Sequence, residues 1–88
     1  MITGTTDSGF TYTLDEETMD DYELLEMLCD IDNGKESLIT QAAKQLLGVE
    51  QLNALKEHVR NEKGRVPATK MIAEITQILS ENKEGKNS

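Results

Sequence analysis

The hydrophobic residues of this 88-residue chain follow two different periods. In FTYTL, the side chains of Phe10, Tyr12 and Leu14 alternate with threonines. This is the two-residue period of a strand with one apolar face. A single strand is not stable alone, so this one must pair with residues 2–6 through a turn at residues 7–9, with the rest of the fold, or with another chain.

After Leu14 the period becomes that of a helix. Asp15 or Thr18 can cap its N-terminus, and the acidic residues in its first turn suit the positive end of the helix dipole. An apolar stripe faces one side, while Glu23, Glu26 and Asp30 face the other. The stripe consists of Tyr22, Leu25, Leu28 and Ile31, with Leu24 and Met27 beside it. Asn33-Gly34 then ends an amphipathic helix with an acidic outer face.

Three further helices follow from the same reasoning. Residues 37–47 have a broad apolar face made of two adjacent rows, Leu38, Ala42 and Leu46 beside Ile39, Ala43 and Leu47. Gly48 interrupts this helix, and a third one over residues 49–61 turns Leu52, Leu55 and Val59 inward. The turn EKGRVP precedes a last helix from Ala68, with Met71, Ile72, Ile75, Ile78 and Leu79 as its apolar set.

These elements predict a mainly α fold, a small orthogonal bundle of about four helices with a short N-terminal β-strand or hairpin. We expect residues 1–8 to be a flexible lead-in, residues 9–80 a single helical domain and residues 81–88 a flexible polar tail. A chain of this length buries a modest core, which favours marginal stability or self-association.

Charge is distributed unevenly along the chain. Residues 1–36 hold eleven acids and one base, for a net charge of −10, whereas residues 37–88 hold six acids and eight bases, for +2. Nine of the acids lie between Asp15 and Asp32. Phosphate binding and base stacking need exposed cations and aromatic rings, which this acidic chain with three aromatic residues lacks, so we expect no nucleic-acid binding.

The segment Asp30–Gly34 superficially resembles a calcium-binding loop. Such a loop needs a glycine at its sixth position and a bidentate glutamate at its twelfth. Counted from Asp30, these positions hold Lys35 and Gln41. The segment is therefore interpreted as a helix stop.

The other reactive residues also lack partners for catalysis or metal binding. Glu23, Glu26 and Asp30 share a helix face, but no Glu-x-x-His motif accompanies them. His58 is the only histidine and lies at the border of an apolar stripe, where ordinary packing is expected. Cys29 is the only cysteine, which suits a reducing compartment. We therefore expect a non-enzymatic protein without metal or cofactor. We also expect no membrane attachment, because the sequence has no long apolar run and no signal-peptide pattern at its start.

A family resemblance is carried by three stretches in this order: DDYELLEMLCDIDNG, LLGVEQLNALKEHVRNEKGRVP and MIAEI. They resemble the tail assembly chaperones of bacteriophages and prophages with long non-contractile tails. That family shares a strand-like start, an acidic helix with Asp-Asp-aromatic-Glu-Leu-Leu-Glu, a helix ending in Leu-Leu-Gly and an Arg-Val-Pro turn. The resemblance covers residues 9–80, and Tyr22 stands where tryptophan is as frequent.

The resemblance implies a role in virion morphogenesis. Such a chaperone binds the tape measure protein during tail assembly, keeps it soluble, helps to recruit tail tube protein around it and is absent from the mature tail. It would act in the cytoplasm of the bacterial host. A tape measure protein is largely helical with apolar seams, so its chaperone needs exposed apolar patches rimmed by charge.

The residues expected to make this surface lie on two helices. They are Leu24 and Met27 on the acidic helix, and Met71, Ile72 and Leu79 on the last helix, although each could equally belong to the core. The acidic helix is also expected to dock on the basic half of another copy, head to tail, into a ring or spiral. The facing sets are Asp20, Asp21, Glu23 and Glu26 against Lys56, Arg60, Lys63 and Arg65.

Two alternatives remain at this point. A small acidic phage protein that mimics DNA and inhibits a host DNA-binding enzyme would explain the carboxylates equally well, but not the basic second half. A helix-turn-helix regulator over residues 49–79 is weaker, because its recognition helix would carry Lys70 as its only base.

Overall fold

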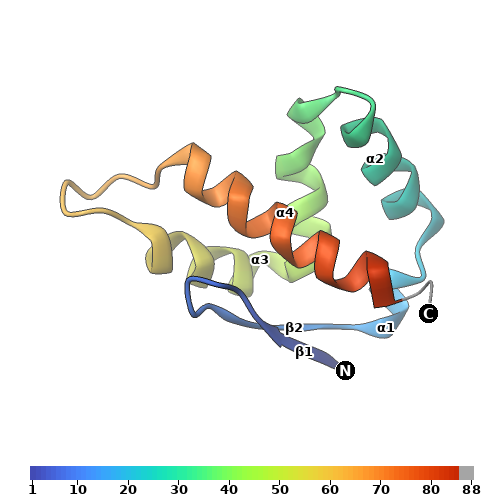
Figure 1. Ribbon diagram of the computed structural model, residues 1–88, viewed down its shortest axis with the longest axis horizontal. Coiled ribbons are helices and arrows are strands. Elements are labelled where there is room, and N and C mark those ends of the chain that lie inside the picture. The colour runs from blue at the N-terminus through green and yellow to red at the C-terminus, as the bar shows by residue number, and fades with distance from the viewer. Residues whose placement is uncertain (86–88) are drawn as a thin grey trace.

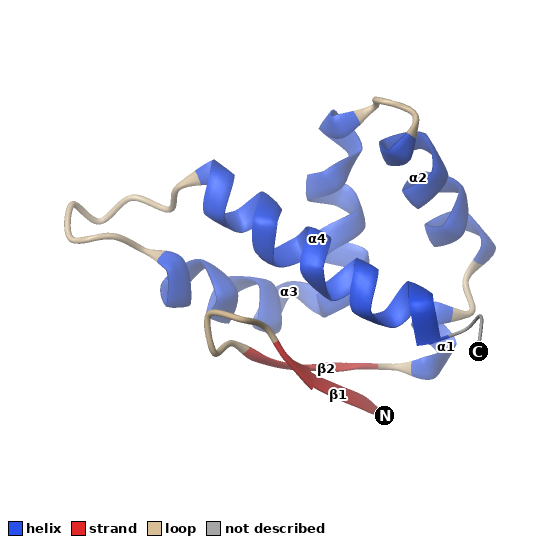
Figure 2. Ribbon diagram, in the orientation of Figure 1, coloured by secondary structure: helices blue, strands red, loops and turns tan. Residues whose placement is uncertain are grey.

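The computed structural model describes residues 1–85. Its elements are β1 (Ile2–Thr5), β2 (Thr11–Leu14), α1 (Glu16–Met19), α2 (Tyr22–Asp32), the 3-10 turn η1 (Glu36–Leu38), α3 (Ile39–Val59) and α4 (Ala68–Gly85). The predicted class, mainly α with a short N-terminal hairpin, is confirmed (Figure 1). Figure 2 shows the two strands lying along one side of the helices.

The strand predicted from FTYTL pairs with the start of the chain. β1 and β2 are antiparallel, with Ile2 opposite Leu14 and Gly4 opposite Tyr12. Residues 2–5, which the sequence assigned to a lead-in, therefore belong to the fold. Between the strands, the Thr6 amide donates to the Phe10 carbonyl over 2.9 Å and so closes the turn.

Gly4 is required because the Tyr12 side chain lies close to its Cα atom, and not because of its backbone conformation. A Cβ at this position would collide with the ring and hydroxyl of Tyr12, the residue opposite it in the hairpin. The aromatic ring covers the glycine and is itself almost fully buried. The pair shows why a residue that weakens most strands is suited to this one.

The acidic segment forms two helices instead of the single helix predicted. α1 ends at Met19, and α2 begins after Asp21, whose side chain accepts from the Glu23 amide over 2.8 Å. Asp15 caps α1 in the same way through the Glu17 amide, whereas Thr18 lies inside α1. A capping aspartate satisfies helix amides from outside the helix, so the second cap starts a new helix in place of continuing the first.

α3 contains the two central helices predicted from the sequence. They run together from Ile39 to Val59, but Gly48 has φ 78° and ψ 164°, which is not helical. This left-handed φ is easy for glycine and strained for other residues. The chain changes direction there, as predicted, and the two halves of α3 diverge in Figure 1.

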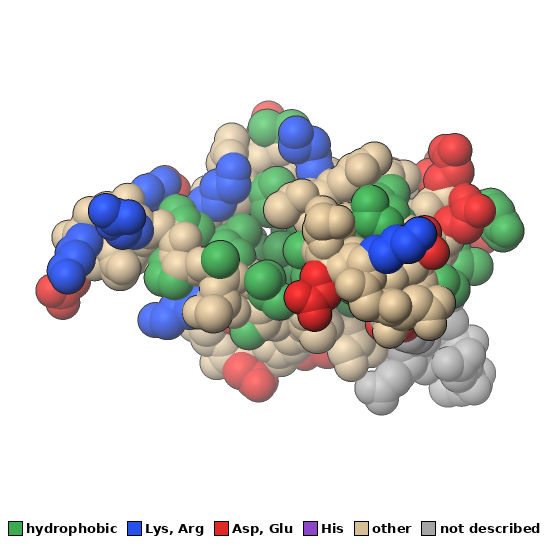
Figure 3. Space-filling view, turned by 90° about the horizontal axis from the view of Figure 1, so that it is seen from above, with side chains coloured by type: hydrophobic (Ala, Val, Ile, Leu, Met, Phe, Trp, Pro, Cys, Tyr) green, Lys and Arg blue, Asp and Glu red, His purple; other side chains and the backbone are tan. Residues whose placement is uncertain are grey.

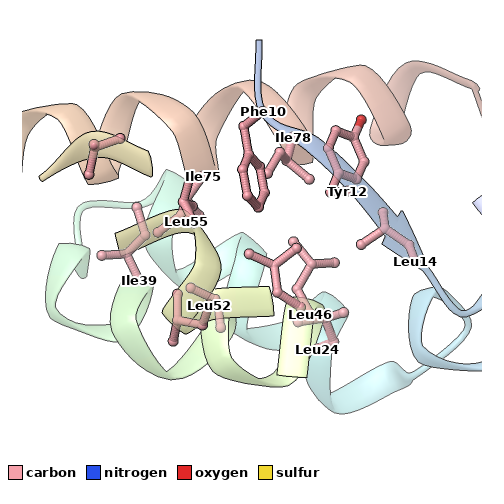
Figure 4. Packing of buried hydrophobic residues seen from close by; sticks show 14 residues of the cluster. Phe10, Tyr12, Leu14, Leu24, Ile39, Leu46, Leu52, Leu55, Ile75 and Ile78 are labelled. Carbon is pink, nitrogen blue, oxygen red and sulfur yellow. The ribbon is translucent and has the colours of Figure 1, made fainter. Parts of the chain in front are cut away.

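The core lies where both halves of α3 meet β2, α2 and α4. Leu14, Leu24, Leu55 and Ile78 are its largest fully buried side chains. Figure 4 shows the buried side chains of the hairpin and α4 pointing toward those of α3. The inward rows predicted for residues 37–47 and 49–61 are confirmed except at Leu38, which lies in η1 and is half-buried.

α4 continues beyond the predicted end of the domain at residue 80. Glu81 accepts a hydrogen bond from the Tyr12 hydroxyl over 2.8 Å, and the Asn82 amide donates to the same hydroxyl over 3.2 Å. Residues 81–85 are therefore helical rather than part of the predicted tail. Residues 86–88, the remainder of that tail, lie outside the described residues.

Candidate functional site

The apolar stripe of α2 faces the core in a different phase from the one predicted. Leu24 is only 1% exposed, whereas Tyr22 and Leu25, placed in the stripe from the sequence, are 71% and 55% exposed. Leu28 and Ile31 are half-buried and pack against the core. Leu24 therefore cannot belong to a docking surface, and that prediction is wrong.

A shallow apolar groove separates α2 from α4. It has a volume of about 260 Å³, and Leu28 and Ile31 of α2 line one wall. Leu79 of α4 lines the opposite wall, with Ile39 at the start of α3 between them. Asp32, Thr76 and Ser80 complete the lining. The lining of the groove thus combines four apolar residues with three polar ones.

Ile72 extends this apolar surface along α4. It is 43% exposed and lies one helical turn before Thr76, on the same face of the helix. Of the five apolar residues predicted for the binding surface, Ile72 is the one that is open to solvent. Met27, Met71 and Leu79 are half-buried against the core, and among these Leu79 lines the groove.

Several carboxylates of the acidic segment have partners within the chain. Asp15 and Asp21 are N-caps, and Asp21 also accepts from the Gln45 side chain over 3.1 Å. Glu16 pairs with the N-terminal ammonium over 3.0 Å, and the hydrogen bond from this group lowers the pKa of the Glu16 carboxyl. The predicted docking residues Asp20, Glu23 and Glu26 are exposed.

The predicted basic cluster surrounds the loop between α3 and α4. Arg60 already bonds within this region, to the Glu57 carboxylate over 3.0 Å and to the Gly64 carbonyl over 2.7 Å. The Arg60 bond lowers the pKa of Glu57. Lys63 and Arg65 are exposed, and their backbone amides bond to the Asn61 side chain. Lys56 is half-buried.

The two charged regions lie toward opposite ends of the molecule's long axis, which measures 39 Å. In Figure 3, Lys and Arg side chains gather at the left end, over the loop between α3 and α4, and Asp and Glu predominate at the right end. Hydrophobic side chains occupy a hollow between them. The charge asymmetry of the sequence is therefore also an asymmetry in space.

A polar cluster joins the hairpin turn to α3 and α4. Thr6 donates to the buried Glu74 carboxylate over 2.7 Å, and Ser8 shares a hydrogen bond of 3.0 Å with Nε2 of His58. The His58 ring also lies 5.5 Å from that of Phe10, centroid to centroid. These contacts fasten the turn to the helices, and the position of His58 agrees with the packing role predicted for it.

Within residues 1–85, no three His, Cys, Asp or Glu side chains come together as a metal site. None of the helices over the same residues has the length and apolar character needed to cross a membrane. Cys29 is exposed on α2. The groove between α2 and α4 combines apolar lining from three helices and is the candidate binding site of this molecule.

Comparison of the chain with protein-family models, with curated proteins and with solved structures finds no match.

Sequence reasoning missed the groove because it identified the apolar residues but not their partners. Leu28, Ile31, Ile39 and Leu79 were all assigned to apolar faces, yet a groove arises only where two such faces diverge. The sequence offered one usable signal. α2 has more apolar residues than one buried face can hold, so some of them must reach solvent or a partner.

Proposed function

We propose that this protein is a tail assembly chaperone that binds apolar segments of the tape measure protein and keeps them soluble. The family resemblance supplies the identity of the partner. The observation that carries the proposal is the apolar groove between α2 and α4, continued along α4 by the exposed Ile72. A helical partner can insert its apolar side chains into such a groove.

The size of the groove sets the strength of the contact. A volume of about 260 Å³ holds one or two large side chains. Each would contribute about 1.5–3 kcal/mol on full burial, which favours weak, reversible binding. A chaperone that must leave a finished tail needs contacts of this kind, repeated along a long partner by several copies.

The surrounding charge indicates which apolar segments fit best. Asp32 is the charged residue in the lining of the groove, and the last turn of α2 carries no basic residue. A partner helix with lysine or arginine beside its apolar seam would meet charges of opposite sign. Such exposed pairs mainly guide encounter and register, because each contributes only about 0–1 kcal/mol.

Association between copies and recruitment of tail tube protein belong to the same proposal. The exposed members of the two charged sets, Asp20, Glu23 and Glu26 against Lys63 and Arg65, are available for a head-to-tail contact. Sedimentation at low and high salt tests this part, and a monomer at both salt concentrations would contradict it. Arg60 and Asp21 already bond within the chain, so they are less suited to such a contact.

The DNA-mimic alternative gains no support from the positions of the carboxylates. Asp15, Asp21 and Glu16 bond to backbone amides or to the N-terminus of their own chain. Their local roles account for part of the acidic segment without a DNA-binding target. We therefore prefer the chaperone.

Co-expression with the tape measure protein of the same genome tests the proposal. The wild type is expected to move that protein from the insoluble to the soluble fraction and to co-purify with it. Ile72→Asp places a charge beside the groove and should abolish most of this effect. The matched control is Val49→Asp, because Val49 is 59% exposed on α3 and does not line the groove.

Circular dichroism melting of both variants shows whether each remains folded. Loss of solubilisation by Ile72→Asp with retention by Val49→Asp would support the groove as the binding site. A tape measure protein that stays insoluble with the wild type, or equal solubilisation by the two variants, would refute the proposal.

A further inference from the structure

The two edges of the β-hairpin are covered differently. On the β2 side, the Thr13 amide donates to the side-chain oxygen of Gln51 over 2.7 Å, and the Gln51 amide donates to the Thr13 carbonyl over 2.7 Å. The glutamine side chain thus takes the place of a neighbouring strand. It shows that both backbone groups of Thr13 point away from β1.

The register fixes the direction of the backbone groups in β1. In an antiparallel pair, hydrogen-bonded and non-hydrogen-bonded residue pairs alternate. Thr13 lies opposite Thr3, and Thr11 lies opposite Thr5, so both are non-hydrogen-bonded pairs. The N–H and C=O groups of Thr3 and Thr5 therefore point outward from β1, on the edge away from β2.

This outer edge of β1 has no cover within the described residues. Thr3 and Thr5 are exposed, and over residues 1–85 their backbone groups form no hydrogen bond with a helix or side chain. The strand also lacks the proline, lysine and bulge by which proteins commonly protect an edge. In Figure 1, β1 lies at the margin of the molecule with only β2 beside it.

A pocket adjoins the N-terminal end of this edge. Ile2 and Met19 give it an apolar lining, and Glu16, Glu17 and Asp20 give it carboxylates. Its volume is about 410 Å³. Glu16 pairs with the N-terminal ammonium, whereas the side chains of Glu17 and Asp20 form no hydrogen bond or ion pair within residues 1–85.

We propose that the outer edge of β1 binds an extended peptide segment as a third strand, with a lysine or arginine of that segment in the adjoining pocket. Thr3 and Thr5 would each exchange an N–H and a C=O bond with the added strand. Residues that face each other across strands project to the same side of a sheet, so the residue beside Ile2 enters the pocket that Ile2 lines. Ile2 and Met19 pack against its methylene groups, and Glu17 and Asp20 meet its charge.

This site goes beyond the proposed chaperone function and does not depend on it. The β1 edge and its pocket share no residue with the groove between α2 and α4. A helical segment fits the groove, whereas an extended segment fits the edge. Failure of either site would therefore leave the other untouched.

An NMR titration of the full chain with a synthetic peptide tests the edge. The probe is a capped seven-residue peptide of alternating threonine and valine with lysine at its centre, added to about 5 mM because binding over so few residues is weak. We expect the amide signals of Thr3 and Thr5 to shift. The same peptide with glutamate in place of lysine should bind roughly fivefold more weakly.

Two variants separate the backbone and charge contributions. Thr3→Pro removes an outward N–H without breaking the bonds between β1 and β2, and should weaken binding roughly fivefold. Thr11→Pro is its matched control, because it removes an N–H from the opposite edge of the hairpin. Glu17→Gln combined with Asp20→Asn should also weaken binding of the lysine peptide, while the control pair Glu36→Gln and Glu62→Gln should not.

The spectra also report whether the hairpin survives each proline substitution. If Thr3→Pro unfolds it, the charge variants decide the outcome, because their carboxylates lie outside the strands. The proposal is overturned if the Thr3 and Thr5 amides do not shift, if the shifts map only to the groove residues, or if the lysine and glutamate peptides bind equally.

Discussion

The hairpin and α2 both pack on α3, but they are held there in different ways. β2 buries two of its four residues, whereas α2 buries only Leu24 of its eleven. The hairpin is also tied to the helices by the side chains of Tyr12 and Thr6 and by the backbone of Thr13. α2 is attached to α3 by the burial of Leu24 and by the bond from Gln45 to Asp21, the N-cap residue of α2.

This difference indicates where the molecule can change shape. Segments with few fully buried residues open with a smaller free energy than the core does. We therefore expect α2 to open more readily than the hairpin. Because α2 forms one wall of the groove, its opening would widen the site proposed for the tape measure protein.

Leu24→Ala should have the largest effect on α2. Removing a fully buried leucine typically lowers the free energy of unfolding by about 2–5 kcal/mol. We expect the amides of α2 to lose protection from hydrogen exchange first, while those of β2 keep theirs. Leu25→Ala is the matched control, since this neighbouring leucine is 55% exposed and should change stability by less than about 1 kcal/mol. Equal loss of protection in α2 and the hairpin would contradict the comparison.

Asp21→Ala should weaken the attachment of α2 by a smaller amount. The substitution removes the N-cap on the Glu23 amide and the bond from Gln45, so we expect a loss of about 1–2 kcal/mol in chemical denaturation. Asp20→Ala provides the control, because the exposed Asp20 side chain makes no capping hydrogen bond and this residue caps the end of α1 only through its backbone amide. If both substitutions lower the free energy of unfolding equally, the loss of a negative charge, and not the loss of the N-cap, explains the effect of Asp21→Ala.

Tyr12→Phe tests the attachment of the hairpin and should cost about 1 kcal/mol by loss of the bonds to Glu81 and Asn82. Burial, followed by the bond to Glu81, raises the pKa of Tyr12 above its ordinary value of 10.0. The folded state therefore holds the phenol proton more tightly than the unfolded state. Stability due to this group is complete below pH 10 and is lost as pH rises through the folded pKa.

Thermal melts of the wild type and Tyr12→Phe above pH 10 test whether stability falls with rising pH because of Tyr12. The wild type should lose stability more steeply than Tyr12→Phe. Tyr22→Phe should follow the wild type, because Tyr22 is 71% exposed. A variant without Tyr12 that shows the wild-type pH dependence would show that another group is responsible.

The sequence by itself determined the class and most of the local structure. Alternating residues in FTYTL identified β2, the end of α2 at Asn33-Gly34 was read correctly, and Gly48 was identified as a break. These features depend on neighbours within a few residues, and such signals are written directly into the chain. Of the predicted surface, the exposed position of Ile72 agrees with the structure, whereas Leu24 proved to be core.

Only the tertiary structure decided the features that depend on which faces meet. The apolar residues of α2 cover so much of the helix that more than one side of it could face the core. Packing against α3 selected the side that buries Leu24 and leaves Tyr22 and Leu25 exposed. Likewise, pairing with residues 2–5 selected one of three possible partners for β2, and Gln51 covered its other edge from a distant part of the chain. Contacts across such sequence separations leave no periodic trace, so the groove and the open edge of β1 become visible only when the chain is folded.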